Sequence, residues 1–195
     1  MSPRKVTVSD NDILEATAAA VAELGPTRLT LAEVAGRVGL AAPTLVQRFG
    51  SKRGLLLALA SMGTESTASE FESLRAGASS PLNAAVRLLL CFPASIESPD
   101  VLSNHLAFLQ IDLNDGEFRG HAANHSRSFR TALRGLLEEA IANGELREAD
   151  SDRLARALSA TAGGSMLAWA IEREGALVDW VRGDLETVLA RFRPD

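Results

Sequence analysis

Apolar residues recur every three or four positions along most of this chain, which is the spacing of amphipathic helices. The first such segment has Asn11 or Asp12 as its cap and ends at Gly25 and Pro26. Further helices are expected at about 31–38, 43–49, 52–75, 81–93, 98–113, 117–143, 151–173 and from Gly175 to about 192. Since no segment alternates like a strand, we predict an all-α fold. It has a three-helix head and a body of roughly six helices.

Residues 30–49 predict two short helices joined by a tight turn. Thr30 and Glu33 have the spacing of a capping box, and Gly39 suits the left-handed position that closes a helix. Pro43 suits the first turn of the next helix. This spacing is typical of a helix-turn-helix, and it also occurs between ordinary neighbours in a helical bundle.

The second short helix has an outward face suited to reading DNA. Leu45 and Phe49 are expected to point inward, which leaves a polar stripe on the opposite face. Glutamine can pair with adenine and arginine with guanine, through two hydrogen bonds each. A hydroxyl or a cation at a helix N-terminus can hold a phosphate. The residues predicted to bind DNA are Thr30, Pro43, Thr44, Gln47, Arg48, Lys52, and Arg4 and Lys5 of an N-terminal arm.

Several short segments between residues 11 and 58 match a known pattern in order. They are Ile13-Leu14-Glu15-Ala16, Ala22-Glu23-Leu24-Gly25, Leu29 to Ala35, Val38-Gly39-Leu40, Thr44-Leu45, Phe49 to Lys52, and Leu55-Leu56. Together they resemble the N-terminal domain of the TetR/AcrR family of transcriptional regulators. Ala142 to Leu146 and the last two helices have a looser resemblance to the ligand-binding and dimerisation domain of that family.

The resemblance implies a homodimeric repressor that binds a near-palindromic operator and is released by a small molecule. It assigns residues 1–10 to a flexible arm, 11–51 to the DNA-binding domain and 52–195 to effector binding and dimerisation. Ala32, Ala41, Ala42 and Val46 depart from the polar or aromatic residues frequent in the family. Because these departures leave fewer groups to reach DNA, a helical ligand-binding or scaffold protein with weak or lost DNA binding is the alternative.

Charge is distributed unevenly along the chain, which has a net charge of −5. Residues 1–54 carry seven Lys or Arg and five Asp or Glu, whereas residues 55–195 carry thirteen and twenty. A weakly basic head on an acidic body keeps the phosphate-facing end distinct. Arg4 and Lys5 could enter the minor groove or form a solvated tail.

Composition also bears on the compartment. The chain has no apolar run long enough to span a membrane, and its N-terminus has no apolar core of a secretory signal. The single cysteine, Cys91, cannot form an internal disulfide. We therefore expect a cytoplasmic protein.

The last two helices predict a dimer interface. The last helix has a single apolar seam at alternating spacings of three and four, and the helix before it has small residues that allow close approach. Two such helices from each protomer would form a four-helix interface. The alternative is that the seam faces the core of its own chain. The predicted interface residues are Leu154, Leu158, Thr161, Ser165, Val178, Val181, Leu185, Val188 and Phe192.

The middle helices supply a candidate effector pocket with apolar walls, suited to a hydrophobic or aromatic molecule. Each of its residues could equally be ordinary core. The predicted lining is Phe92, Leu102, His105, Phe108, Leu109, Phe118, His121, His125, Phe129, Met166 and Trp169. His121 and His125 could bind a metal with His105 or Asp112, but a histidine pair without a metal is the preferred interpretation.

Catalytic chemistry is not expected. Cys91, His105 and Asp112 are of suitable types for a nucleophile, a base and an orienting group, but no motif fixes them together. We therefore predict that the chain is not an enzyme and that it uses no cofactor.

Overall fold

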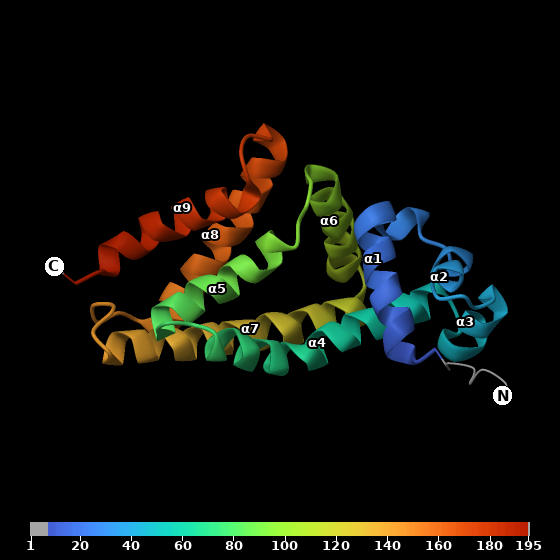
Figure 1. The fold of residues 1–195 in the computed structure, drawn as a ribbon, viewed down its shortest axis with the longest axis horizontal. Helices are drawn as coiled ribbons and strands as arrows, with labels where there is room; N and C mark the ends of the chain where they lie inside the picture. The colour runs from blue at the N-terminus through green and yellow to red at the C-terminus, as the bar shows by residue number, and fades with distance from the viewer. Residues whose placement is uncertain (1–7, 195) are drawn as a thin grey trace, which may run out of the picture. The chain divides into compact units, whose positions relative to one another are not determined.

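The computed structural model describes residues 8–194 and, among them, all side chains except those of residues 64–70. Every regular element in these residues is helical, which confirms the predicted all-α class (Figure 1). The α-helices are α1 (Asp10–Arg28), α2 (Leu31–Arg37), α3 (Ala42–Phe49), α4 (Lys52–Ala76), α5 (Pro81–Ala94), α6 (Pro99–Asn114), α7 (Gly116–Ala142), α8 (Ser151–Glu172) and α9 (Leu177–Leu189). The short 3₁₀ helix η1 (Ala190–Phe192) follows α9.

The first helix differs from its prediction at both ends. Its cap is Ser9 rather than Asn11 or Asp12, because the Ser9 hydroxyl accepts from the backbone of Asp12 while the Asp12 carboxylate reaches back to the backbone of Ser9. Gly25 leaves the helical conformation with a φ of 72°, as the predicted end requires. One further helical turn nevertheless continues through Pro26 to Arg28.

The chain divides into two compact units. Unit 1 contains Met1–Glu65 and Asp100–Ala122, and unit 2 contains Ser66–Pro99 and Ala123–Asp195. This division differs from the domain boundary expected after residue 51. The reason is that Leu55, Leu56 and Phe118 join the core of the first three helices. Helices α4 and α7 therefore contribute residues to both units.

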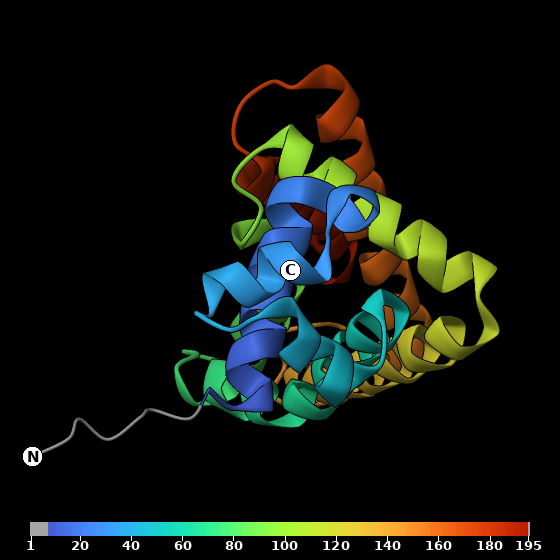
Figure 2. The same cartoon turned by 90° about the vertical axis from the view of Figure 1, so that its right-hand side faces the viewer.

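Unit 1 gathers α1, α2 and α3 around one apolar core (Figures 1 and 2). Phe118 is only 1% exposed and meets Phe108 edge to face, with ring centroids 6.1 Å apart. Asn104 of α6 donates to the carbonyl of Ala22 at 2.7 Å. These contacts make α6 and the first turns of α7 part of the unit that holds α3.

Arg53, in the first turn of α4, joins that helix to the junction of α6 and α7. Its guanidinium binds the Asp115 carboxylate through both oxygens, at 3.0 and 2.8 Å, and Glu117 at 3.0 Å. It also lies 5.5 Å from the centroid of the Phe118 ring. Hydrogen bonds from Arg53 lower the pKa of Asp115 below its usual value.

Unit 2 packs α5, α8 and α9 together. Much of the seam predicted to bind a partner is buried within its own chain. Val178, Val188, Phe192 and Thr161 are half-buried. The other five predicted interface residues are at most 5% exposed within their own chain: Leu154, Leu158, Ser165, Val181 and Leu185.

None of the helices in the described residues is both long enough and apolar enough to span a bilayer.

Asp112 of α6 provides a test of unit 1 by pH. Burial raises the pKa of this half-buried carboxyl from 3.8 to about 6, and the nearby charge of His121 partly opposes the rise. The folded chain therefore binds more protons than the unfolded chain between about pH 4 and pH 6. The contribution of Asp112 to the free energy of unfolding is favourable at low pH and is lost as the pH rises through about 6.

We expect Asp112→Asn to be more stable than the parent chain at pH 7, with the difference shrinking as the pH falls from about 6 to about 4. Urea titrations across this range, with exposed Glu97→Gln as the control, measure it. A difference that stays constant with pH would contradict the assignment.

Candidate nucleic-acid interface and ligand cavity

Helix α2 begins with the predicted cap, but only one half of the capping box forms. The Thr30 hydroxyl accepts from the backbone of Glu33 at 3.1 Å. Glu33 does not reach back to residue 30. Its carboxylate instead binds Arg37 one turn later, at 3.1 Å, and Arg37 also binds Glu23 of α1 at 2.7 Å. This ion-paired cluster ties α2 to α1 and lowers the pKa of Glu23.

The turn between α2 and α3 follows the predicted geometry. Gly39 has a φ of 69°, which is the left-handed region that glycine tolerates best. Leu40 then donates its backbone N–H to the carbonyl of Ala35 at 2.9 Å, which closes α2. Helix α3 begins without a side-chain cap at Ala41 and has Pro43 in its first turn.

Helix α3 turns one face to the core and the other to solvent. Leu45 is fully buried and Phe49 is half-buried against the core of unit 1. Pro43 and Gln47 are exposed as predicted, whereas Thr44 is half-buried. The helix-turn-helix therefore presents α3 as a surface that can enter a DNA groove.

Val46 is a candidate contact that the sequence does not predict directly, because there it counts only as a departure from an aromatic residue frequent in the family. It is 48% exposed and lies one turn after Pro43 on the same face. An exposed methyl group at this place can contact the methyl group of thymine in the major groove. The spacing of three between Pro43 and Val46 was the signal in the sequence.

Arg48 does not extend freely from α3. Its Nη2 lies 2.7 Å from the Asp10 carboxylate, and its Nη1 donates to the carbonyl of Val8 at 2.9 Å. The side chain is 28% exposed. A base contact by Arg48 thus requires it to leave Asp10, and exposed ion pairs of this kind contribute only about 0.2–1 kcal/mol.

Lys52 and its neighbours shape the start of α4. The Lys52 ammonium donates to the carbonyl of Thr27 at 3.0 Å, so it is bound within unit 1 rather than extended. The Ser51 hydroxyl caps the helix by accepting from the backbone of Gly54 at 3.1 Å. A Cβ added at Gly54 would lie 2.0 Å from the carbonyl oxygen of Phe49, so this close approach of α3 and α4 requires glycine. Arg4 and Lys5 lie outside the described residues.

The predicted effector residues are divided between the two units. In unit 1, Leu102 and Phe118 are buried, His105, Phe108 and His121 are half-buried, and Leu109 is exposed. Burial also lowers the pKa of His105. In unit 2, Trp169 is buried and donates its indole N–H to the carbonyl of Gly175 at 3.1 Å. The structure brings together the remaining four: Phe92, His125, Phe129 and Met166.

Those four residues line a cavity of about 440 Å³ in unit 2. Its walls come from the end of α4, from α5, α7 and α8. Residues not predicted from the sequence complete it, among them Phe71, Leu74 and Cys91. Among the described residues, no group of three or more His, Cys, Asp and Glu side chains could hold a metal ion, so the alternative metal site is not formed there.

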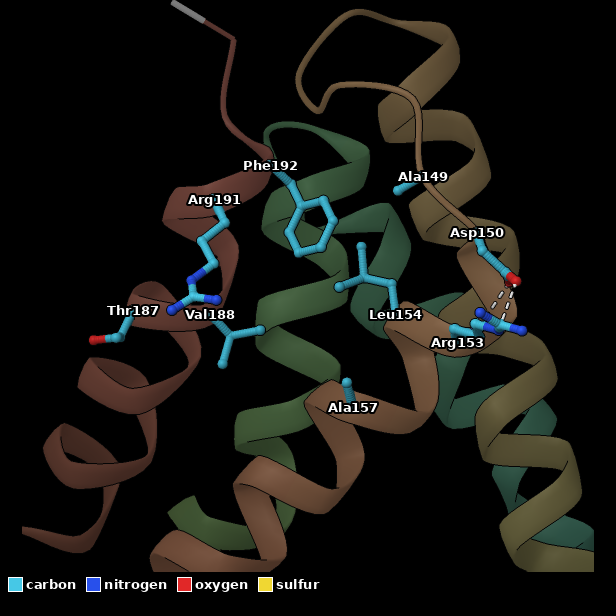
Figure 3. A pocket seen from close by; sticks show the side chains of 9 residues that line it. All are labelled: Ala149, Asp150, Arg153, Leu154, Ala157, Thr187, Val188, Arg191 and Phe192. Carbon is cyan, nitrogen blue, oxygen red and sulfur yellow. Dashed lines mark hydrogen bonds and ion pairs between the residues drawn. The ribbon is translucent and has the colours of Figure 1, made fainter.

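A second pocket of about 510 Å³ lies between the start of α8 and the end of α9 (Figure 3). Leu154 and Phe192 extend into it from opposite sides, and Arg153 and Arg191 lie at its edges. Arg153 binds Asp150 at 3.3 Å. Ala157 and Thr187 are exposed residues on the two helices that also line this pocket.

Comparison with family models identifies both parts of the chain. Residues 13–59 match a model described as bacterial regulatory proteins, tetR family. Residues 107–185 match a model of the tetracyclin repressor-like C-terminal domain. The first match contains the whole of α2 and α3. A search of curated protein sequences found no significant match.

Solved structures share the fold at low sequence identity. A putative transcriptional regulator from Saccharomonospora viridis in complex with choline is 20% identical, with a TM-score of 0.81 over 95% of this chain and 98% of that one. A TetR transcription regulator from Haloarcula marismortui is 17% identical, with a TM-score of 0.79 over 95% and 98%. FadR from Bacillus subtilis in complex with stearoyl-CoA is 18% identical, with a TM-score of 0.66 over 91% and 96%.

A double-mutant cycle tests whether Arg48 moves to DNA. We expect Asp10→Asn to strengthen binding to duplex DNA, because it releases Arg48 and removes a negative charge. In an Arg48→Ala background only the charge effect remains, so the gain from Asp10→Asn should be smaller. Fluorescence anisotropy with labelled duplex measures all four proteins at one salt concentration. Equal gains in both backgrounds would show that Arg48 stays on Asp10.

Proposed function

Because the chain belongs to the TetR family of bacterial regulatory proteins, we propose that it is a repressor that binds a near-palindromic operator as a homodimer. A small, largely apolar effector bound in the cavity of unit 2 releases it. The observation that carries the proposal is the solvent-facing side of α3, where Pro43, Val46 and Gln47 are exposed while Leu45 holds the helix to the core. A dimer bound at a promoter can repress transcription by steric blocking, which needs no contacts beyond those to DNA.

Two helices, α4 and α7, run through both units and so support coupling between the effector cavity and the DNA-binding head. Helix α4 carries Leu55 and Leu56 in the core of unit 1 and Phe71 and Leu74 at the cavity of unit 2. Helix α7 likewise carries Phe118 in the first and Phe129 in the second. An effector that binds the DNA-incompetent form about 100-fold more tightly biases the equilibrium by about 2.7 kcal/mol.

Selection from a randomised duplex library tests the DNA-binding proposal. We expect an inverted repeat with half-sites about one helical turn apart. Gln47→Ala should relax one base position in each half-site and cost about 1–3 kcal/mol there. Lys52→Ala should weaken binding to all sequences and reduce the salt slope by about one unit.

Ser128→Ala, an exposed change on α7, is the control and should behave as the parent chain. If no sequence is enriched, the chain is instead a helical ligand-binding or scaffold protein. The alanines at Ala32 and Ala42 would then be the signs of lost DNA binding.

A surface of α8 supports the homodimer. Five of its exposed residues follow one another at spacings of three and four, so they form one stripe along the helix. Leu167 is 48% exposed and Ile171 is 83% exposed, although both are apolar. The stripe consists of Ala157, Ala160, Gly164, Leu167 and Ile171, and Gly183 and Thr187 are exposed on the neighbouring α9. We propose this stripe, in place of the buried seam, as the surface that meets the second protomer.

The proposed interface also distinguishes the two pockets of unit 2 as candidate effector sites. The pocket of Figure 3 shares Ala157 and Thr187 with the exposed faces of α8 and α9, so a partner would cover it. The cavity lined by Phe92 and Phe129 shares no residue with the stripe. We therefore assign the effector to the cavity.

Leu167→Asp tests the dimer surface. A carboxylate at the centre of an apolar interface would be buried without a partner, so we expect the dimer dissociation constant to rise at least about tenfold. Leu113→Asp, at a 62% exposed leucine of α6, is the matched control and should leave the dimer intact. Sedimentation equilibrium measures both. An unchanged dimer in Leu167→Asp would rule out this surface.

A further inference from the structure

The cavity of unit 2 has a composition that restricts the charge of its ligand. Its volume of about 440 Å³ falls within the range of roughly 300–1,000 Å³ typical of small-molecule sites. Apolar side chains form most of the wall, among them Leu74, Leu88 and Met166. The described residues that line it include no Asp, Glu, Lys or Arg.

Aromatic rings make up a large part of the wall. Phe71 from α4 and Phe129 from α7 meet edge to face, with centroids 6.0 Å apart. Phe92 from α5 lines the same cavity and is 41% exposed, although phenylalanine is usually buried. Such rings favour contact with another ring, in offset or edge-to-face geometry.

The serine hydroxyls of the cavity donate within their own chain segments. Ser95 donates to the carbonyl of Phe92 at 2.8 Å, and Ser159 donates to the carbonyl of Ala155 at 2.8 Å. A cation would lose its hydration shell here without meeting an Asp or Glu among the described lining residues, and an anion would meet only the imidazole of His125. The cost of such desolvation is large. Because the protons of these serine hydroxyls are already used, the wall suits a ligand with few polar groups.

A quaternary ammonium ion is the competing ligand class, because aromatic faces attract cations. The faces that do this best belong to tryptophan, followed by tyrosine and phenylalanine. This chain has no tyrosine, and neither Trp169 nor Trp180 lines the cavity. The described lining residues include no carboxylate, so among them the three phenylalanines would have to replace the water around the cation.

We propose that the cavity of unit 2 selects an uncharged, ring-containing molecule and rejects cations and anions of the same shape. This inference rests on the proposed function, since it names the class of effector that the same cavity binds. The wall of Phe71, Phe92 and Phe129 provides the affinity, and the lack of Asp, Glu, Lys and Arg among the described lining residues provides the selectivity.

Three probes of one shape test the proposal. They are 4-tert-butylphenol, which is neutral, (4-hydroxyphenyl)trimethylammonium, which is its cationic counterpart, and 4-tert-butylbenzoate, which is anionic. Isothermal titration calorimetry on the full chain at neutral pH measures their dissociation constants. We expect the neutral probe to bind at least about tenfold more tightly than either ion.

Cys91 reports where the probe binds. It lines the cavity, it is exposed, and it is the single cysteine of the chain. A bound probe should therefore slow alkylation of the thiol by iodoacetamide, read as one mass shift. Because this measurement uses the unmodified chain, it does not depend on whether a variant folds.

A pair of glycine variants gives the matched control. A Cβ added at Gly163 of α8 meets no atom within 4 Å, and Gly163 lines the cavity, so Gly163→Leu should fill part of the cavity and abolish binding. Gly135 of α7 is also helical with open space and does not line the cavity, so Gly135→Leu should bind as the parent does. Circular dichroism confirms that both variants fold.

Each other result overturns the proposal. Equal or tighter binding of the cation would identify an aromatic cage for an ammonium group, and tight binding of the anion would require a charge outside the lining. Failure of all three probes to bind would exclude the ligand class. Because titration uses no DNA, these failures leave the DNA selection to decide the proposed repressor function separately.

Discussion

The shortness of α3 is the constraint on which the rest of unit 1 depends. An isolated helix of eight residues is not stable in water, because the first turn costs more conformational entropy than its few hydrogen bonds return. Helix α3 therefore exists only while Leu45 is buried and both of its ends are fixed. Pro43 restricts the first turn, and the approach of Gly54 to Phe49 fixes the last one. The outward face is free to contact DNA because the inward face supplies all of the stability.

The need to stabilise short helices by packing explains why unit 1 extends beyond the three helices of the DNA-binding head. The three helices α1, α2 and α3 alone bury too little apolar surface to be very stable, and Phe118 adds a large ring to their core. Arg53 then fixes the junction of α6 and α7 to the start of α4 through Asp115 and Glu117. Each of these exposed ion pairs is weak alone. Arg53, however, combines a bidentate pair with Asp115, an ion pair with Glu117 and a contact with the Phe118 ring, so the three interactions together hold one side chain. Residues far along the chain thus become part of the DNA-binding unit.

Local features of the sequence predicted the local features of the fold. The cap at Thr30, the left-handed Gly39 and the early Pro43 each follow from one residue and its nearest neighbours. Local sequence patterns could not predict which residues far apart in the chain come into contact. Periodicity marks the apolar seam of α9 but cannot tell whether Val181 meets its own chain or a partner. It likewise cannot place Phe118 in unit 1 and Phe129 in unit 2, although both lie on α7, nor pair Arg48 with Asp10.

Two of the cations predicted to bind DNA share one property that bears on how the proposed binding is switched. Arg48 and Lys52 are both satisfied inside unit 1, by Asp10 and Val8 and by the carbonyl of Thr27. In the proposed DNA complex each would exchange an internal acceptor for one on DNA, so neither would gain the full energy of a new bond. The net gain in binding free energy would therefore be small per residue and would depend on the position of each side chain. A small displacement of α3 or of the start of α4 would remove this gain, and in the proposed homodimer both heads would have to fit the DNA at once.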